Sequence, residues 1–241
     1  MRILITNDDG IYAEGIALLV EWARKLGEIT VAAPKIEQSG KSHAIIFTEP
    51  VQIRKVDLFD GVEAYEVDST PADCIRFATN GLDRKYDLVL SGINRGMNIG
   101  TDIVYSGTVA AIFEAGQFGH RAIAFSTSHD GLPDAAQYLD MAYDFIIENN
   151  LFDANPIYNV NIPLGADGIR LTRQGVSYFT DRFEHIEGDF YIQKGEYLPD
   201  PDLADESIDS SAVAAKKISV TPMATGRSDM IAFEKLKFLN N

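Results

Sequence analysis

Residues 1–33, MRILITNDDGIYAEGIALLVEWARKLGEITVAA, contain a strand pattern, a polar loop, a helical pattern and a second strand pattern in succession. Arg2–Thr6 is predicted to be a buried strand because it is a short, almost uninterrupted apolar run. Gly15–Leu26 carries apolar residues at helical spacing, and Ile29–Ala33 is again strand-like. This order predicts the start of a parallel sheet whose strands are connected by helices.

The same alternation continues through more than half of the chain. VQIRKV (51–56) and VEAYEV (62–67) are predicted to form a hairpin that turns near residues 60–61. Further strands are expected at 87–90 and 122–125, and helices at 71–82, 107–116 and 134–147. Strands alternating with helices are typical of a parallel sheet covered on both faces. The predicted fold class is therefore α/β, with a Rossmann-like, doubly wound and mostly parallel sheet.

The last third of the chain has a different pattern. Strand-like segments at 158–162 and 169–172 follow each other without an obvious helix between them. Residues from about 176 to 209 are aromatic and acidic and predict a projecting hairpin arm, an element that often packs on a second subunit. A short helix, a returning strand and a terminal helix are expected after it. We expect residues 1–155 to form an α/β core that residues 156–241 complete, within one structural domain.

Composition and charge restrict the class of partner. With 241 residues, 46% of them hydrophobic, the chain can bury a substantial core. Its net charge of -15 argues against a nucleic-acid polymer or an anionic membrane surface, because polyanions need a basic binding surface. A small anion can still bind through a metal cation.

Cysteine content and hydropathy predict a cytoplasmic location. The single cysteine, Cys74, excludes an intramolecular disulfide and fits a reducing compartment. The first polar loop comes too early for a signal-peptide core, and no later apolar run is long enough to span a bilayer.

Four polar loops carry the candidate chemistry. They are NDDG (7–10), QSGKS (38–42), SGINRGMN (91–98) and YSGT (105–108). Open α/β sheets bind ligands at the carboxyl ends of their strands, where these loops are expected. Together they offer carboxylate, hydroxyl and amide oxygens, which suit a hard divalent cation such as Mg²⁺ or Mn²⁺.

Each loop alone also has a simpler structural interpretation. NDDG is equally suited to a turn that caps the next helix. QSGKS lacks the spacing of a phosphate-binding P-loop, and SGINRGMN lacks the G-x-G-x-x-G fingerprint of dinucleotide-binding proteins. YSGT fits an ordinary helix N-cap as well as an anion site.

The ordered set of motifs is more specific than any one of them. NDDGI, APKIEQSGKS, STPADC, DLVLSGINRGMN, YSGTVAA and SVTP occur in this order, and together they resemble the SurE family of survival-protein nucleotidases. The resemblance is strong from Met1 to about Ser126 and returns in LTRQG and SVTP. It implies a divalent-metal-dependent phosphomonoesterase that hydrolyses nucleoside 5′- and 3′-monophosphates, with short polyphosphate as a further substrate. It also implies a homodimer or homotetramer whose subunits exchange C-terminal elements.

The resemblance also implies which residues form the site. It assigns one divalent ion, Mg²⁺ or Mn²⁺, per subunit to Asp8, Asp9, Ser39 and Asn94, and phosphate contacts to Asn98, Ser106, Gly107 and Thr108. A cation between two adjacent carboxylates would convert their mutual repulsion into shared attraction. Asp8, Asp9 and a metal-activated water all remain candidate nucleophiles. Asp8 is favoured for a chemical role because it lies nearer the end of its strand.

Two rival functions and several residues need separate interpretations. A binding protein could hold a metal-nucleotide complex without hydrolysing it, whereas an NAD-dependent oxidoreductase is disfavoured by the missing glycine fingerprint. Cys74 is expected to be a buried structural thiol. Surface or structural roles are expected for the four histidines, His43, His120, His129 and His185. Lys41 and Arg95 fit either phosphate contacts or solvated cations.

Overall fold

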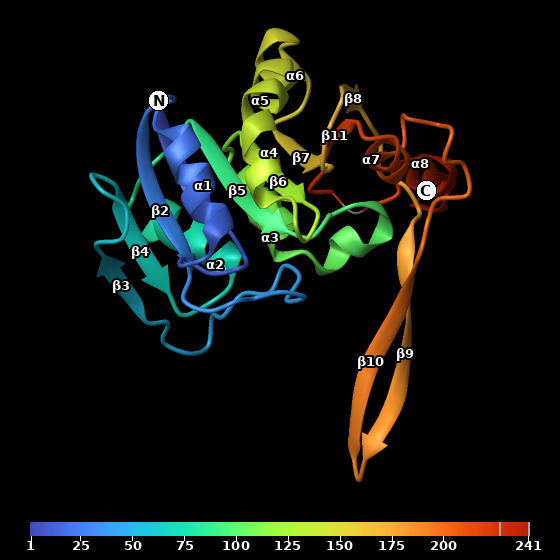
Figure 1. Ribbon diagram of the computed structural model, residues 1–241, viewed down its shortest axis with the longest axis horizontal. Coiled ribbons are helices and arrows are strands. Elements are labelled where there is room, and N and C mark those ends of the chain that lie inside the picture. Colours follow the sequence, from blue (N-terminus) through green and yellow to red (C-terminus); the bar gives the residue numbers. More distant parts are fainter. Residues whose placement is uncertain (227, 241) are drawn as a thin grey trace.

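The computed structural model describes residues 1–226 and 228–240, and most of its strands lie in one large sheet (Figure 1). In chain order the strands of this sheet are β1 (Arg2–Thr6), β2 (Glu28–Pro34), β3 (Ile53–Val56), β4 (Glu63–Val67), β5 (Leu88–Arg95), β6 (Ala122–Thr127), β7 (Ile157–Ile162), β8 (Ile169–Leu171) and β11 (Ile218–Pro222). In space their order is β3-β4-β2-β1-β5-β6-β7-β11-β8. The sheet thus includes strands from both the N-terminal and the C-terminal part of the chain.

The central strands of the sheet run parallel. β1 pairs in parallel with β2 and β5, and parallel pairing continues outward to β4 on one side and to β6 and β7 on the other. β3 is antiparallel to β4, as the hairpin prediction requires, and β11 is antiparallel to β7. The predicted α/β class with a doubly wound, mostly parallel sheet is confirmed.

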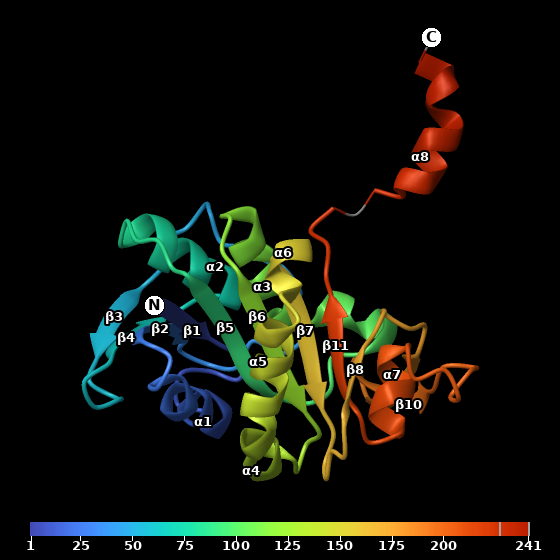
Figure 2. The ribbon, with the colours of Figure 1, turned by 90° about the horizontal axis from the view of Figure 1, so that it is seen from above.

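Helices cover both faces of this sheet (Figure 2). The helices are α1 (Glu14–Ala23), α2 (Pro71–Arg76), α3 (Gly107–Gln117), α4 (Leu132–Ala135), α5 (Leu139–Glu148), α6 (Leu151–Ala154), α7 (Asp209–Ala214) and α8 (Met230–Leu236). Side chains of β1 alternate between the two faces: Ile3 and Ile5 share a core cluster with α1, α4 and α5, whereas Leu4 packs with α2 and α3. Complete burial of such a side chain contributes about 1.5–3 kcal/mol. The apolar run of β1 is explained by its burial on both faces.

One predicted helix is divided in the structure. Residues 134–147 were expected to form a single helix, but α4 and α5 are separate and joined by a 3₁₀ turn, η3 (Ala136–Tyr138). The apolar residues at helical spacing still face the core, because Ala135, Leu139 and Ala142 pack in the same core cluster. The predicted helix at 71–82 is also composite, with α2 continuing into a π-helical turn, η1 (Phe77–Gly81).

β5 is longer than the sequence predicts. Residues 91–95, expected in a loop, continue the strand to Arg95. The register between β5 and β6 shifts between Ser91 and Asn94, and Gly92 has a φ of +127° there. A Cβ at Gly92 would lie 2.3 Å from the carbonyl oxygen of Phe125, so only glycine fits this close approach. The irregularity places polar residues on a strand where a loop was expected.

The C-terminal part carries two projecting elements. β9 (Tyr178–Glu187) and β10 (Phe190–Leu198) form an antiparallel hairpin that extends away from the sheet (Figure 1), which confirms the predicted arm. α8 and a 3₁₀ turn, η4 (Lys237–Asn240), lie away from the sheet beyond β11 (Figure 2). Among the helices described, none is both long and apolar enough to span a membrane.

Candidate metal and phosphate site

Two adjacent carboxylates occupy the turn that follows β1. Asp8 is only 4% exposed, and Asp9 is partly buried. The side-chain amide of Asn7 donates a hydrogen bond to the Gly10 carbonyl at 2.8 Å, and Gly10 has a φ of +101°. NDDG is therefore a turn, and this turn holds both carboxylates at the carboxyl end of the central strand.

Other polar loops contact this acidic pair directly. The Gln38 backbone N–H donates to the Asp8 carbonyl at 2.7 Å, and the Arg95 N–H donates to Asp9 Oδ2 at 3.3 Å. The Thr108 hydroxyl donates to Asp8 Oδ1. Residues distant in the sequence thus meet at one edge of the sheet, as expected for the carboxyl ends of parallel strands.

Burial makes ionisation of both carboxylates unfavourable. Desolvation raises the pKa of Asp8 to about 6, an effect that hydrogen bonding by Thr108 only partly opposes. Burial also raises the pKa of Asp9, with a further contribution from the charge of Glu37. Arg95 forms its ion pair with Glu14, and the ion pairs found within residues 1–226 and 228–240 include neither Asp8 nor Asp9. A divalent cation would supply the missing positive charge.

The other two predicted ligands have suitable free oxygen lone pairs. Ser39 Oγ donates to Glu37 Oε1 at 2.6 Å, and Asn94 Nδ2 donates to the Gly96 carbonyl at 2.8 Å, which leaves Asn94 Oδ1 as an acceptor. Two carboxylates, a hydroxyl and an amide oxygen form a donor set that fits Mg²⁺ or Mn²⁺. In the described part of the chain no group of three or more His, Cys, Asp or Glu side chains could hold a metal. The set therefore differs from a typical zinc site.

A hollow of about 320 Å³ opens beside the acidic pair. Asp9 and Ser39 line it, together with Arg95 and His129. Glu37 lines it as well; this residue lies within the motif APKIEQSGKS but is not among the predicted ligands. Asp8 and Asn94 are not among the lining residues, so the hollow exposes only part of the predicted ligand set.

Asn98 is held in a buried amide network. Its Nδ2 donates to Ser126 Oγ at 2.7 Å. Its backbone N–H donates to Asn161 Oδ1 at 2.8 Å, and its carbonyl accepts hydrogen bonds from Asn161 Nδ2 at 2.9 Å and Asn159 Nδ2 at 2.8 Å. Asn98 is thereby fixed in place, and its phosphate contact stays a prediction. The sequence signal for this network is the pair of asparagines in YNVNI, which are polar residues within a buried strand.

The start of α3 adjoins the acidic pair. Ser106 is the N-cap of this helix, since its Oγ accepts a hydrogen bond from the Val109 N–H at 3.1 Å. Gly107 lies so close to Asp8 that a Cβ at this position would be 2.9 Å from Asp8 Cβ and 3.0 Å from its Oδ2. The helix N-terminus, which attracts anions, therefore lies directly against a carboxylate predicted to bind metal.

Gly107→Ala is expected to lower kcat/KM for phosphate release by about tenfold to a hundredfold, because the new methyl group would displace the Asp8 carboxylate. Steady-state kinetics at saturating Mg²⁺ would measure this. Gly116→Ala is a matched control in the same helix, where the new Cβ would approach Ile157 Cγ2 at 3.1 Å. A folded Gly107→Ala protein with unchanged kinetics would show that this contact does not position Asp8.

Cys74 is buried, as expected of a structural thiol. Burial raises the pKa of this thiol well above its ordinary value, so a nucleophilic thiolate is not available at neutral pH. Cys74→Ala is expected to retain most of the phosphate release and to lower the free energy of unfolding by about 1 kcal/mol. Loss of activity in a variant with a normal urea transition would contradict this structural role.

His43 contacts the middle of α3. Its Nε2 is 2.7 Å from Glu114 Oε2, and Arg76 donates to Glu114 Oε1 at 2.8 Å. The imidazole also stacks on Phe113 with the ring centroids 6.4 Å apart. These contacts tie the segment after the second polar loop to the middle of α3.

Comparisons with known proteins agree with this fold and with these motifs. The sequence model described as "Survival protein SurE" matches residues 3–181. A 5'-nucleotidase SurE from Thermosipho melanesiensis is 40% identical over 238 residues, which cover 93% of this chain and 91% of that protein. Another, from Alkaliphilus metalliredigens, is 38% identical and covers 100% of this chain and 99% of its own length. A crystal structure of the SurE protein from Aquifex aeolicus matches with a TM-score of 0.81 and 33% identity over the full length of both chains. The chain belongs to the SurE family.

Proposed function

We propose that this chain is a divalent-metal-dependent phosphomonoesterase that converts nucleoside 5′-monophosphates to nucleoside and inorganic phosphate. The observation that supports this best is the buried pair Asp8 and Asp9, which lies against the N-terminus of α3 without a cationic partner in the described ranges. Relatives that match almost the whole chain are named 5'-nucleotidase. In this proposal Asp8, Asp9, Ser39 and Asn94 hold Mg²⁺ or Mn²⁺.

The chain's own residues have distinct roles in this proposal. The N-terminal N–H groups of α3 bind phosphate oxygens, and the Ser106 cap fixes the direction of that helix end. Thr108 holds one oxygen of Asp8, so the carboxylate keeps a single orientation toward the substrate. The divalent cation, when bound, supplies positive charge to the phosphoryl group and lowers the pKa of a coordinated water.

The nucleophile is one of three groups in this proposal. The first two candidates are Asp8 and Asp9, either of which would attack phosphorus directly. The third is a water molecule that gives up a proton to one of these carboxylates. We favour Asp8 for the chemical role because it is buried and held by Thr108. A phosphoenzyme trapped on Asp9, or on neither residue, would contradict that assignment.

We also propose hydrolysis of nucleoside 3′-monophosphates and of short polyphosphate. The test is phosphate release from AMP, 3′-AMP and tripolyphosphate by metal-stripped protein with Mg²⁺ or Mn²⁺ added back. Release from AMP supports the 5′-nucleotidase activity, and the two other substrates test the wider range separately. Nucleotide binding without phosphate release from any substrate would favour a metal-nucleotide binding protein instead.

Exposed apolar side chains support a homodimer or homotetramer with exchanged C-terminal elements. On the arm Phe183 is 70% and Phe190 71% exposed, and in α8 Ile231 is 71% exposed. Burying such surfaces against a second copy of the chain would remove them from water. Sedimentation equilibrium would test this, with a monomer at micromolar concentration as the contradicting result. The proposed boundary near residue 155, between α6 and β7, stays a prediction.

Charge and cysteine content support our proposals for the compartment and the class of partner. A buried, unpaired Cys74 fits a reducing compartment, so we propose a cytoplasmic enzyme. A net charge of -15 supports a small nucleotide rather than a nucleic-acid polymer or a membrane surface as the binding partner.

A further inference from the structure

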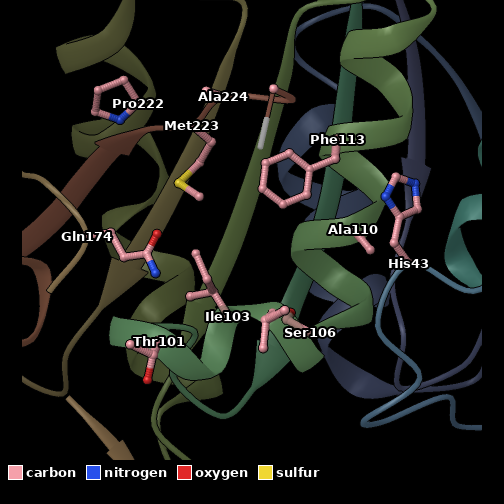
Figure 3. Close-up of a pocket in the computed structure, with 12 residues that line it drawn as sticks. His43, Thr101, Ile103, Ser106, Ala110, Phe113, Gln174, Pro222, Met223 and Ala224 are labelled. Atoms are coloured by element: carbon pink, nitrogen blue, oxygen red, sulfur yellow. The ribbon is translucent and has the colours of Figure 1, made fainter. Parts of the chain in front are cut away.

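A second cavity lies between α3 and the segment that follows β11, and His43 also lines it (Figure 3). Its volume is about 430 Å³, within the range of small-molecule sites. One wall is formed by Ala110 and Phe113 of α3 together with its N-cap Ser106, and the three residues recur at helical spacing. The opposite wall includes Met223, which follows β11. The cavity therefore joins segments that are more than a hundred residues apart in the sequence.

The chemistry of these walls suits a flat, partly polar ring. The ring of Phe113 and the thioether of Met223 both border the cavity (Figure 3), and aromatic and thioether groups pack well against the faces of heterocycles. Gln174 borders it too; its Nε2 donates to the Gly100 carbonyl at 2.9 Å, which leaves Oε1 free to accept a hydrogen bond. The Nε2 of His43 is engaged by Glu114, so its Nδ1 is left for a ligand.

Polar contacts hold the walls in place. The Met223 N–H donates to the Ile157 carbonyl at 3.0 Å, and the Thr101 N–H donates to the Ser177 carbonyl at 2.9 Å. The N–H of Ser42 donates to the Tyr105 carbonyl at 3.0 Å beside the helix start. A cavity whose walls are fixed in this way loses little conformational freedom when a ligand binds.

The cavity adjoins the candidate phosphate site at the start of α3. Ser106 belongs to both, since it lines the cavity and caps the helix whose next residue, Gly107, contacts Asp8. Seven residues separate Ser106 from Phe113, about 10 Å along a helix axis. That length is comparable with the distance from the phosphate to the far edge of the base in a nucleoside monophosphate.

We propose that this cavity binds the nucleobase of the substrate, with the base against Phe113 and Met223 and the phosphate at the start of α3. This inference rests on the proposed nucleotidase function and deepens it, because it assigns the residues that distinguish a nucleotide from other phosphomonoesters. Gln174 Oε1 and His43 Nδ1 are the groups placed to contact polar atoms of the base.

Ribose 5-phosphate tests this inference because it keeps the phosphate and the sugar of AMP and lacks the base. The wild-type kcat/KM for AMP is expected to exceed that for ribose 5-phosphate by about tenfold or more, the scale of one base–aromatic contact. Phe113→Ala is expected to lower kcat/KM for AMP by about tenfold and to leave ribose 5-phosphate within about twofold. Adenosine binding to the metal-stripped protein, measured by calorimetry, should weaken in parallel.

Two further variants separate a binding role from a folding role. Phe118→Ala is a matched control, because Phe118 is also partly buried at the end of α3 and packs on the same core cluster but does not line the cavity. It should leave the AMP to ribose 5-phosphate ratio unchanged. Phe113→Leu keeps an apolar side chain and should lose part of the AMP preference while folding normally.

Three results would overturn the inference, and each is distinct from failure of the proposed function. Equal wild-type kcat/KM for AMP and ribose 5-phosphate would show that the base is not recognised. An unchanged ratio in both Phe113 variants would show that the base binds elsewhere. If the Phe113 variants change the oligomer dissociation constant and leave the ratio of kcat/KM for AMP to that for ribose 5-phosphate unchanged, a second copy of the chain fills the cavity. Absence of phosphate release from both compounds would refute the proposed function itself.

Discussion

Asp8→Asn is expected to lower kcat for AMP hydrolysis by about a thousandfold or more, the scale seen when a reacting or metal-holding group is removed. The carboxylate is buried and held in one orientation by Thr108, so the substitution removes a positioned negative charge from the proposed metal site. Asp9→Asn should show a loss of similar size if both residues hold the cation. Phosphate release at saturating Mg²⁺ would measure both losses. Residual activity above about a tenth of the wild type in a folded Asp8→Asn protein would contradict the assignment.

The same substitution should stabilise the metal-free protein. Burial raises the pKa of Asp8 from 3.8 to about 6, so the folded chain binds this proton more tightly than the unfolded chain does. The free energy of unfolding then falls as the pH rises from about 4 to about 6 and stays lower above that range. At pH 8 this loss is about 3 kcal/mol for wild-type protein and is absent from the uncharged variant.

Urea denaturation in the presence of a chelator would measure this difference at pH 8 and at pH 4. The variant should be the more stable protein at pH 8, and its advantage should largely disappear at pH 4. Asp57→Asn, at an exposed position between β3 and β4, serves as the control and should show neither effect. A variant less stable than the wild type at pH 8 would indicate that ionised Asp8 stabilises the metal-free fold.

Removal of divalent metal is expected to abolish phosphate release, and Mg²⁺ or Mn²⁺ should restore it. The physical reason is that two carboxylates, Asp8 and Asp9, lie side by side without a cationic partner in the part of the chain that the structure describes. In the absence of a cation they would repel the phosphate dianion of the substrate. A phosphate-release assay before and after dialysis against a chelator would measure this effect. Full activity in protein with no detectable metal would exclude the metal-dependent mechanism.

Much of the fold could be predicted because the local patterns agree with the tertiary packing. Ile3, Leu4 and Ile5 form an uninterrupted apolar run because β1 is buried on both faces. The arm was predictable because residues 178–198 lack helical periodicity and carry apolar side chains that the core does not need. The extension of β5 was not predictable, because it depends on the close approach of Gly92 in β5 to Phe125 in the neighbouring strand β6.

Only part of the candidate site could be predicted from the sequence. The acidic pair and the start of α3 were accessible because their motifs are contiguous in the sequence and mark strand and helix ends. The network around Asn98 was not, because Asn159 and Asn161 lie on a strand that follows it by about sixty residues. The cavity beside Phe113 was also inaccessible, because Gln174 and Met223 reach it only through the arrangement of the sheet.

Titration of the metal-stripped protein with Mn²⁺, followed by electron paramagnetic resonance of the free ion, would show whether the acidic pair binds a divalent cation. We expect one tightly bound Mn²⁺ per chain in the wild type and in Asp57→Asn, and loss of that site in Asp8→Asn. A site of unchanged affinity in Asp8→Asn, or no tight site in the wild type, would contradict the claim that the acidic pair holds a divalent cation.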